Sequence, residues 1–508
     1  MRPLKTYFAF LIMGLACAHN IFAQDEEILK QESELLGNEV SLSLPEALKM
    51  ALESNLDVAI GRITPAIEET NILSERDAFD PSLDISLDYG ENSSPRSAEQ
   101  QAADGRASTK SRTATGQVSV SQKTSLGTEL SLSSRTRDRM TTFNDFEDEF
   151  STFVGVEATQ PLLKGFGTDN NLASIRIAEK GKIIAEAEFQ NQVETIIQDV
   201  FFAYYDLLFS SADVISKKKS MELAERLSRD NKKRYELGAM TKLDISNADA
   251  EIAGRKNAVV EAEEIVQLNE NKLLRLITRD MGIWLQNELD LTDTLNEPGK
   301  EIPQNYDIAV GLANRSDYQA LLHRADQNEL RLAFQKQQLL PQLDLTTSFG
   351  YNGLSDDLGE SYKNISETRD EDWNVGFRFI IPWGNYREKA RFREAELLKA
   401  RTILEIKNKE QDVIEEIDNA LISLNSSKKK LVASRTARRF AEENAAAEEV
   451  KLTEGSSTTF VVLELQQDAQ EAETTELRNL REFNKALVRL KRAQGLLLKE
   501  NGITILSD

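Results

Sequence analysis

The sequence contains only one cysteine and two histidines among its 508 residues. Cys17 lies within residues 1–23, where a positively charged start, an apolar run and a small residue, Ala23, form the pattern of a secretory signal peptide. We expect cleavage after Ala23, which leaves a chain without cysteine and excludes disulfides and thiolate metal sites. Because Cys17 also lies in GLAC, a weak lipoprotein signal, lipidation stays open as an alternative.

Residues able to perform catalysis are equally scarce. The expected mature chain retains one histidine, His323, in a helical pattern, where we interpret it as a surface or packing residue. The sequence offers no histidine pair, cysteine pair or His-Ser-Asp set. The stretch LKGFGTDNN at 163–171 lacks the spacing of a phosphate-binding loop. We therefore predict no enzyme activity, no catalytic residue, no cofactor and no metal site.

Long apolar runs are also missing after the expected cleavage site. The best candidate, FFAYYDLLF at 201–209, is about half the length of a membrane-crossing helix and contains Asp206. The formal charge of −23 becomes −25 once the two basic residues of the signal are removed. So acidic a chain is a poor partner for nucleic acid. With 29% charged residues, extended helical structure is favoured over several compact cores.

Proline is absent from two long stretches, residues 162–297 and 383–508, which we predict to be helical. Apolar residues there recur in steps of three and four, as in Val413, Ile417 and Leu424, which is typical of coiled-coil packing. An unbroken helix over residues 168–237 would be roughly 105 Å long at 1.5 Å per residue. Such a helix requires neighbouring helices to bury its apolar face.

The two halves of the chain repeat one another. In each half the order is helix, proline, two strands, proline, long helix, glycine turn and helix. We therefore predict an internal tandem repeat. The matching stretches are LESNLD (52–57) and LANRSD (312–317), Pro81 and Pro341, VEATQPLLKG (156–165) and FRFIIPWGN (377–385), and RYELGAMTKLD (234–244) and VKLTEGSSTTFV (450–461).

Short strands with strict alternation interrupt the helices. Leu83, Ile85, Leu87 and Tyr89 share one face of the stretch at 81–90. The same alternation over Trp373, Val375, Phe377, Phe379 and Ile381 predicts an outward apolar set in the second half. Alternation alone also fits a half-buried antiparallel sheet. The segments have the length of membrane-crossing β-strands, and because one chain has too few to close a barrel, several copies are expected to complete it.

The first half carries one additional hairpin around KTSLG at 123–127, with longer polar connections at 92–114 and 137–150. Short turns on one side and long loops on the other are typical of outer-membrane barrels. Because the strands of this hairpin are only weakly apolar, four strands per chain are favoured over six.

The order and duplication of these features resemble the TolC-like outer membrane efflux proteins, with QPLLKGFG at 160–167 and RYELGAMTKLD at 234–244 as the most telling stretches. The resemblance covers nearly all of residues 41–500. It implies a mainly α fold with a β-barrel part: a homotrimer with transmembrane β-strands forming a trimeric barrel in outer membrane lipid and long coiled-coil helices forming an α-helical tunnel in the periplasm. It also implies a periplasmic adaptor protein and an inner-membrane pump as partners.

The resemblance places adaptor contacts at the two glycine turns, although glycine also commonly ends helices for local reasons. In the related channel, Asp, Tyr and Arg side chains lock the entrance, but Leu452 and Ser457 stand where Tyr and Arg would be. We hypothesise that Asp244 and Glu464 line an acidic entrance instead; solvated surface acids are the alternative. The expected contact residues are Gly238, Ala239, Met240, Thr241, Gly455, Ser456, Ser457 and Thr458, and the expected strand–helix junctions are Pro81, Pro161, Pro341 and Pro382.

We therefore expect a passive exit duct of a tripartite efflux or type I secretion system, with a secreted coiled-coil scaffold as the alternative. The expected division of the chain is a signal peptide (1–23), an acidic segment (24–40), a first repeat (41–280, strands about 81–162 and helices about 168–278), an equatorial segment (281–304), a second repeat (305–500, strands about 341–382 and helices about 385–498) and a tail (501–508).

Overall fold

The computed structural model describes residues 40–143, 145–238, 240–284, 289–295 and 308–504. The expected signal peptide, Cys17 and residues 24–39 of the acidic segment lie outside the described residues. The chain divides into two compact units. We call them the helical unit (residues 1–65, 186–320 and 406–508) and the sheet unit (66–185 and 321–405).

The helical unit consists of helices and one small pair of strands. β1 (Val40–Leu42) pairs in parallel with β6 (Leu289–Leu291), which lies in the segment 281–304 that the sequence sets apart from the long helices. In the described residues, no helix is both long and apolar enough to cross a membrane. The helices lying wholly or partly in this unit are α2 (Leu44–Ser54), α3 (Leu56–Arg76), α6 (Ala173–Glu236), α7 (Lys242–Ile277), α8 (Met281–Trp284), α9 (Ile308–Asn314), α10 (Ser316–Gln338), α12 (Tyr386–Thr453), α13 (Thr459–Ala493) and α14 (Leu497–Glu500).

Two helices are far longer than the others. α6 has 64 residues and α12 has 68, which correspond to about 96 and 102 Å at 1.5 Å per residue. Leu172 separates the short α5 (Thr168–Asn171) from α6, so the first long helix begins later than the predicted Thr168.

Apolar side chains spaced by three and four residues form the core of the helical unit. On α6, Val193, Ile197, Val200, Tyr204 and Leu207 are almost completely buried. A second cluster joins α12 and α13 through Val413, Ile417, Leu424, Leu431, Leu480 and Phe483. This is the packing that the heptad-like spacing predicts.

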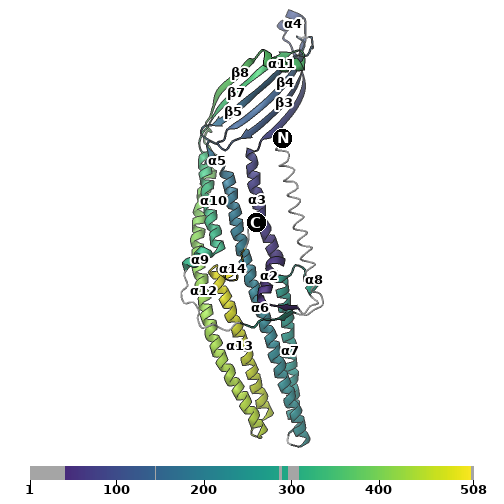
Figure 1. Ribbon diagram of the computed structural model, residues 1–508, viewed down its shortest axis with the longest axis vertical. Helices are drawn as coiled ribbons and strands as arrows, with labels where there is room; N and C mark the ends of the chain where they lie inside the picture. Colours follow the sequence, from purple (N-terminus) through teal and green to yellow (C-terminus); the bar gives the residue numbers. More distant parts are fainter. Residues whose placement is uncertain (1–39, 144, 239, 285–288, 296–307, 505–508) are drawn as a thin grey trace. The chain divides into compact units, whose positions relative to one another are not determined.

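The sheet unit contains a six-stranded antiparallel sheet, in the order β2-β3-β4-β5-β7-β8 (Figure 1). The expectation of four strands is therefore wrong. The additional hairpin is paired along its whole length because its polar residues continue both strands beyond the apolar part, and the connections are correspondingly shorter. The strands are β2 (Ser82–Pro95), β3 (Ser108–Lys123), β4 (Glu129–Thr141), β5 (Phe150–Pro161), β7 (Gln342–Ser355) and β8 (Asp370–Ile380).

The strand register gathers the apolar side chains on one face. Because neighbours across antiparallel strands share a face, one row of directly opposed residues crosses the sheet. Its members range from 42% to 69% exposed: Leu83, Val120, Leu132, Val156, Phe349 and Trp373. The opposite face carries mainly polar residues, among them Asp84, Ser133 and Arg135. We call these two sides the apolar face and the polar face.

A short helix covers one end of the apolar face. α11 (Leu358–Glu367) packs against β5 and β7, and the hydroxyl of its buried Ser361 lies 2.8 Å from that of Thr152. Gly353 of β7 permits this approach, because a Cβ there would lie 2.0 Å from the Ser361 carbonyl oxygen. In the part of the chain that the structure describes, the edge strands β2 and β8 have no further strand beside them.

Candidate functional site

Two helical hairpins of the helical unit contain the predicted contact residues at their turns. Gly455 ends α12 with a φ of +74°; its N–H donates to the Leu452 carbonyl and the Ser456 N–H donates to the Lys451 carbonyl. This pair of bonds is a Schellman motif, which requires the left-handed conformation that glycine adopts easily. Gly238 ends α6 with a φ of +76°. Ala239 lies outside the described residues.

Threonines begin the second helix of each hairpin. Thr241 and Asp244 form a capping box at α7, because the Thr241 hydroxyl accepts from the Asp244 N–H over 3.3 Å and the Asp244 carboxylate accepts from the Thr241 N–H over 2.9 Å. The Thr241 hydroxyl also donates to this carboxylate over 2.6 Å, and the two bonds that the carboxylate accepts from Thr241 lower the pKa of Asp244. Thr458 caps α13 in the same way by accepting from the Val461 N–H. The carboxylate of Asp244 is thus bonded to its own helix terminus, while Glu464 is exposed on α13.

The remaining predicted turn residues lie at the surface or close to it. Met240 and Ser457 are half-buried, and Ser456 is exposed, its hydroxyl donating to the Lys451 carbonyl over 3.1 Å. The two hairpins therefore end in short turns whose side chains are mainly small and polar and lie at or near the surface.

Buried polar contacts hold the two hairpins together. Arg255 of α7, which is 8% exposed, donates to the Leu463 carbonyl of α13 over 2.9 Å and to the Ser220 carbonyl of α6 over 2.9 Å. Nearer the turns, the Asn231 amide donates to the Thr459 hydroxyl over 3.1 Å, with both residues buried. Because a buried donor left unpaired is costly, these contacts fix the hairpins against one another.

Sequence reasoning did not identify the apolar side chains that flank the turns. Leu237 is 84% exposed and Leu243 is 67% exposed around the first turn, and Phe460 is 65% exposed beside the second. Leu237 directly precedes Gly238, and Leu243 and Phe460 each lie five residues after a turn glycine, so an apolar residue at these two spacings is the signal in the sequence. Large apolar side chains gathered at the surface are typical of interaction sites.

The four junction prolines all lie at or near strand ends in the sheet unit. Pro81 precedes β2 and Pro341 precedes β7, while Pro161 is the last residue of β5 and Pro382 follows the end of β8 by two residues. At the end of β5 the Leu162 N–H donates to the Leu343 carbonyl over 2.7 Å, which extends the pairing past Pro161. Proline lacks an N–H, so strand ends are where it is tolerated.

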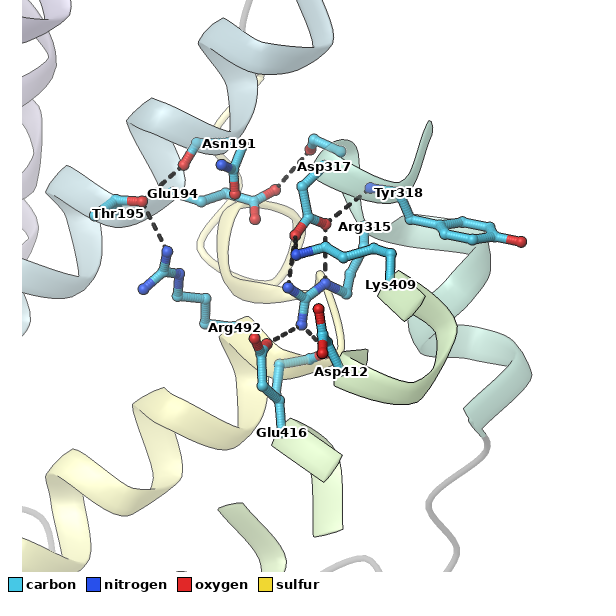
Figure 2. Close-up of polar contacts among 12 residues, drawn as sticks. Asn191, Glu194, Thr195, Arg315, Asp317, Tyr318, Lys409, Asp412, Glu416 and Arg492 are labelled. Atoms are coloured by element: carbon cyan, nitrogen blue, oxygen red, sulfur yellow. Dashed lines mark hydrogen bonds and ion pairs between the residues drawn. The ribbon is translucent and has the colours of Figure 1, made fainter. Parts of the chain in front are cut away.

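The structure also reveals a buried ionic cluster in the helical unit, shown in Figure 2. Arg315, between α9 and α10, binds the Asp317 carboxylate in a bidentate manner over 2.7 and 3.0 Å and pairs with Glu416 of α12. Lys409 of α12 contacts the same Asp317 carboxylate over 2.7 Å. The cluster joins α12 to the break between two helices. Its repeat counterpart, Asn55, occupies the break between α2 and α3 and donates to the Leu276 carbonyl.

Charge pairing and burial shift the pKa values of the carboxyl groups in this cluster in opposite directions. Burial alone would raise the pKa of Asp317, but hydrogen bonds from Arg315 and Lys409 hold it well below its ordinary value. Nearby, burial raises the pKa of Glu194, which accepts from the Ser316 hydroxyl over 3.1 Å. Asp317 is therefore held ionised, whereas ionisation of Glu194 is disfavoured.

Comparison with known proteins agrees with these features. Residues 124–279 match the family model described as outer membrane efflux protein. The solved structures with a similar fold include the CmeC outer membrane channel of Campylobacter jejuni, at 16% identity and a TM-score of 0.67 over 91% of this chain and 90% of that chain. No curated protein matches the chain.

Two further channels have the same fold. VceC of Vibrio cholerae is 16% identical with a TM-score of 0.64, over 89% of this chain and 96% of that chain. The open state of the MtrE channel of Neisseria gonorrhoeae is 18% identical with a TM-score of 0.61, over 91% of this chain and 95% of that chain. The chain thus shares the fold of these outer-membrane channels. The resemblance to the TolC-like outer membrane efflux proteins is confirmed.

Proposed function

We propose that the protein is the outer-membrane exit duct of an efflux or secretion system. In this function the strands lie in the outer membrane, the helices lie in the periplasm, and substrate moves passively through a water-filled interior. The match to the outer membrane efflux family and the channel fold support this assignment. The energy for transport then comes from an inner-membrane partner.

The apolar face of the sheet is the observation that carries the proposal. Leu83, Leu132 and Trp373 are 63%, 54% and 69% exposed on it. Lipid covers such a surface in a membrane barrel, and the polar face then lines the water-filled interior. A secreted coiled-coil scaffold would instead have to bury this face in a soluble sheet, and the exposed row provides no such burial.

The hairpin turns are the proposed docking site for a periplasmic adaptor. Gly238 and Gly455 end their helices without bulky side chains, and Leu237 and Phe460 offer apolar surface on either side. The adaptor would connect three copies of this chain to an inner-membrane pump. Replacing Leu237 and Phe460 with glutamate should abolish cross-linking to the adaptor in cells while leaving the channel assembled.

We further propose that three copies each of Asp244 and Glu464 make the entrance acidic. Glu464 is exposed on α13, whereas the Asp244 carboxylate also caps α7. The test is the cation selectivity of single channels in the double variant Asp244→Asn and Glu464→Gln. A fall in selectivity supports the entrance, and unchanged selectivity contradicts it.

The duct itself is tested with the purified full chain. A channel should require detergent for extraction, migrate as an oligomer that heating converts to monomer, and conduct ions in stepwise currents across a planar bilayer. A scaffold should be extracted without detergent and carry no current. These two results separate the functions without knowledge of the substrate.

A further inference from the structure

The apolar face of the sheet has a polar interruption on its central strands. On β4, β5 and β7 the apolar side chains of this face give way to four small residues: Ser134, Thr136, Thr152 and Gly353. The four lie together, because Thr136 is opposite Thr152 and Thr152 is opposite Gly353. Hydroxyl groups turned toward hydrocarbon are costly, since lipid chains offer them no hydrogen-bond partner. This part of the face is therefore unsuited to direct contact with lipid chains.

α11 covers the interruption and supplies partners for its hydroxyl groups. The Tyr362 hydroxyl lies 3.0 Å from that of Ser134 and accepts from the Thr136 hydroxyl over 2.9 Å. The Ser361 hydroxyl lies 2.8 Å from that of Thr152, and both of these residues are fully buried. Each of the three strand hydroxyls thus has a partner on α11, which makes the helix part of the wall that faces outward.

Aromatic side chains lie level with α11 on other strands. We count residues from the end of each strand that joins the helices. Tyr89 and Trp373 lie seven residues from those ends of β2 and β8, and Tyr351 lies nine residues from that of β7. Tyr362 is held at the same level, because it is bonded to Thr136, seven residues from the start of β4. Tyr362 therefore extends a row of aromatic side chains across strands whose own residues there are small.

This aromatic row marks one border of the apolar face. Seven to nine residues of strand, at a rise of about 3.4 Å and a tilt of about 35–45°, span roughly 17–25 Å of membrane. The apolar bands of outer-membrane barrels are about 25 Å tall and have aromatic girdles at both borders. At the opposite border, Trp383 and Tyr386 are 100% and 82% exposed shortly after β8. α11 is thus placed where hydrocarbon gives way to headgroups.

The two sides of α11 differ as a helix at such a border requires. Tyr362 and Ile365 lie on the side toward the sheet, where Ile365 approaches Gly353. The opposite side carries the exposed residues Glu360, Lys363 and Glu367, of which Lys363 pairs with Glu367 over 3.2 Å. Amphipathic helices with one charged side lie at the boundary between headgroups and acyl chains.

We infer that α11 is an interfacial helix on the outer wall of the channel, with Tyr362 in the aromatic girdle and its charged side among the lipid headgroups of the outer leaflet. The inference rests on the proposed function, because it requires the apolar face to lie in the outer membrane. The helix closes the polar interruption on β4, β5 and β7, and it sets the level at which hydrocarbon ends on these strands.

Quenching by nitroxide lipids tests the depth of α11, and the expected mature chain contributes no cysteine of its own. Lys363→Cys is labelled with a fluorophore in the full chain, which is then reconstituted in phosphatidylcholine vesicles. The nitroxide is placed either on the headgroup or near the end of the acyl chain. We expect the headgroup nitroxide to quench this label about twofold or more strongly than the chain nitroxide, because an interfacial helix lies at the headgroup boundary. Glu367→Cys, on the same side of α11, should give the same result.

Two control positions calibrate the measurement. Ile85→Cys, at a side chain that is 63% exposed in the middle of the apolar face, should be quenched mainly by the chain nitroxide. Glu99→Cys lies on α4 (Ala98–Asp104), in the connection beyond the far end of β2, and should be quenched by neither lipid. Migration as a heat-modifiable oligomer checks that each labelled variant is assembled.

Each outcome decides the inference. Stronger quenching from the headgroup at Lys363 and Glu367 supports it. Labels on α11 that neither lipid quenches would place the helix in water, and labels quenched mainly by the chain nitroxide would place it within hydrocarbon; both results overturn the inference and leave the proposed function standing. An Ile85 label that neither lipid quenches would reject the proposed function itself.

Discussion

The apolar side chains that form the core of the helical unit face inward, whereas those of the apolar face of the sheet face outward. Val200 on α6 and Leu424 on α12 have no exposed surface, while Leu83 on β2 and Trp373 on β8 are more than half exposed. Polar groups show the inverse arrangement, because Arg315 is buried and Asp317 is half-buried between helices, while Asp84 is exposed on the sheet. The helical unit thus buries its core side chains as water-soluble proteins do, whereas the sheet unit exposes apolar side chains as membrane barrels do.

The buried ionic cluster should give the largest effect. Asp317→Ala leaves Arg315 and Lys409 without their shared carboxylate, and breaking a buried pair costs roughly 3–5 kcal/mol. Urea unfolding monitored by a probe in the helical unit measures it. The control is Glu225→Ala on α6 of the same unit, whose exposed ion pair with Arg229 contributes about 0–1 kcal/mol. Equal losses in the two variants would contradict the role of the cluster.

Opposite faces of one strand should respond differently to the same substitution. Leu132→Arg places a charge on the apolar face and should destabilise the channel in lipid vesicles by about 2–4 kcal/mol, whereas Ser133→Arg on the polar face should cost little. The measurement is the free energy of unfolding from the vesicle. If Ser133→Arg were the more damaging of the two, the assignment of the faces would be inverted.

Glycine at the turns should be required because of its backbone conformation and not because a side chain there would clash. Gly455→Ala should destabilise by roughly 1–2 kcal/mol because its φ is +74°. Gly254→Ala, in the middle of α7 with no atom within 4 Å of an added Cβ, should stabilise by about 0.4–1 kcal/mol. Thermal unfolding of both variants provides the comparison. A change of the same sign at both positions would refute the turn geometry.

Glu194 should give the smallest effect, and one that depends on pH. Burial raises the pKa of Glu194 in the folded protein. As pH rises from the ordinary glutamate range toward this raised pKa, the unfolded chain loses its proton before the folded protein does, and the free energy of unfolding therefore falls. Glu194→Gln keeps an acceptor for Ser316 and should match the native protein at pH 4 but exceed its melting temperature at pH 8. A variant that melts lower at pH 8 would mean that the carboxylate is stabilised by Arg492.

Local patterns predicted the elements that follow a simple period. The alternation at Leu83–Tyr89 and Trp373–Ile381 identified the edge strands, and spacing in threes and fours identified the buried side of α6. The outer halves of β3 and β4 escaped notice because their polar residues, such as Lys110 and Arg137, carry no apolar alternation beyond the apolar part of the sheet.

Long-range pairing could not be read from the chain. Arg315 pairs with Glu416, and Asp317 with Lys409, across about a hundred residues, and nothing in a sequence with 85 acidic and 62 basic residues distinguishes these few. The dual role of Asp244 was also hidden, although Thr241 and Asp244 have the spacing of a capping box. Function at the turns was inferred from resemblance, and the exposed Leu237 and Phe460 became visible only in the structure.

The most direct test of the account is single-channel recording of the purified full chain in a planar bilayer. Stepwise ionic currents from the detergent-extracted oligomer, lost when heating converts it to monomer, are the result that we predict. A monomer that leaves the cell envelope without detergent and carries no current would contradict it.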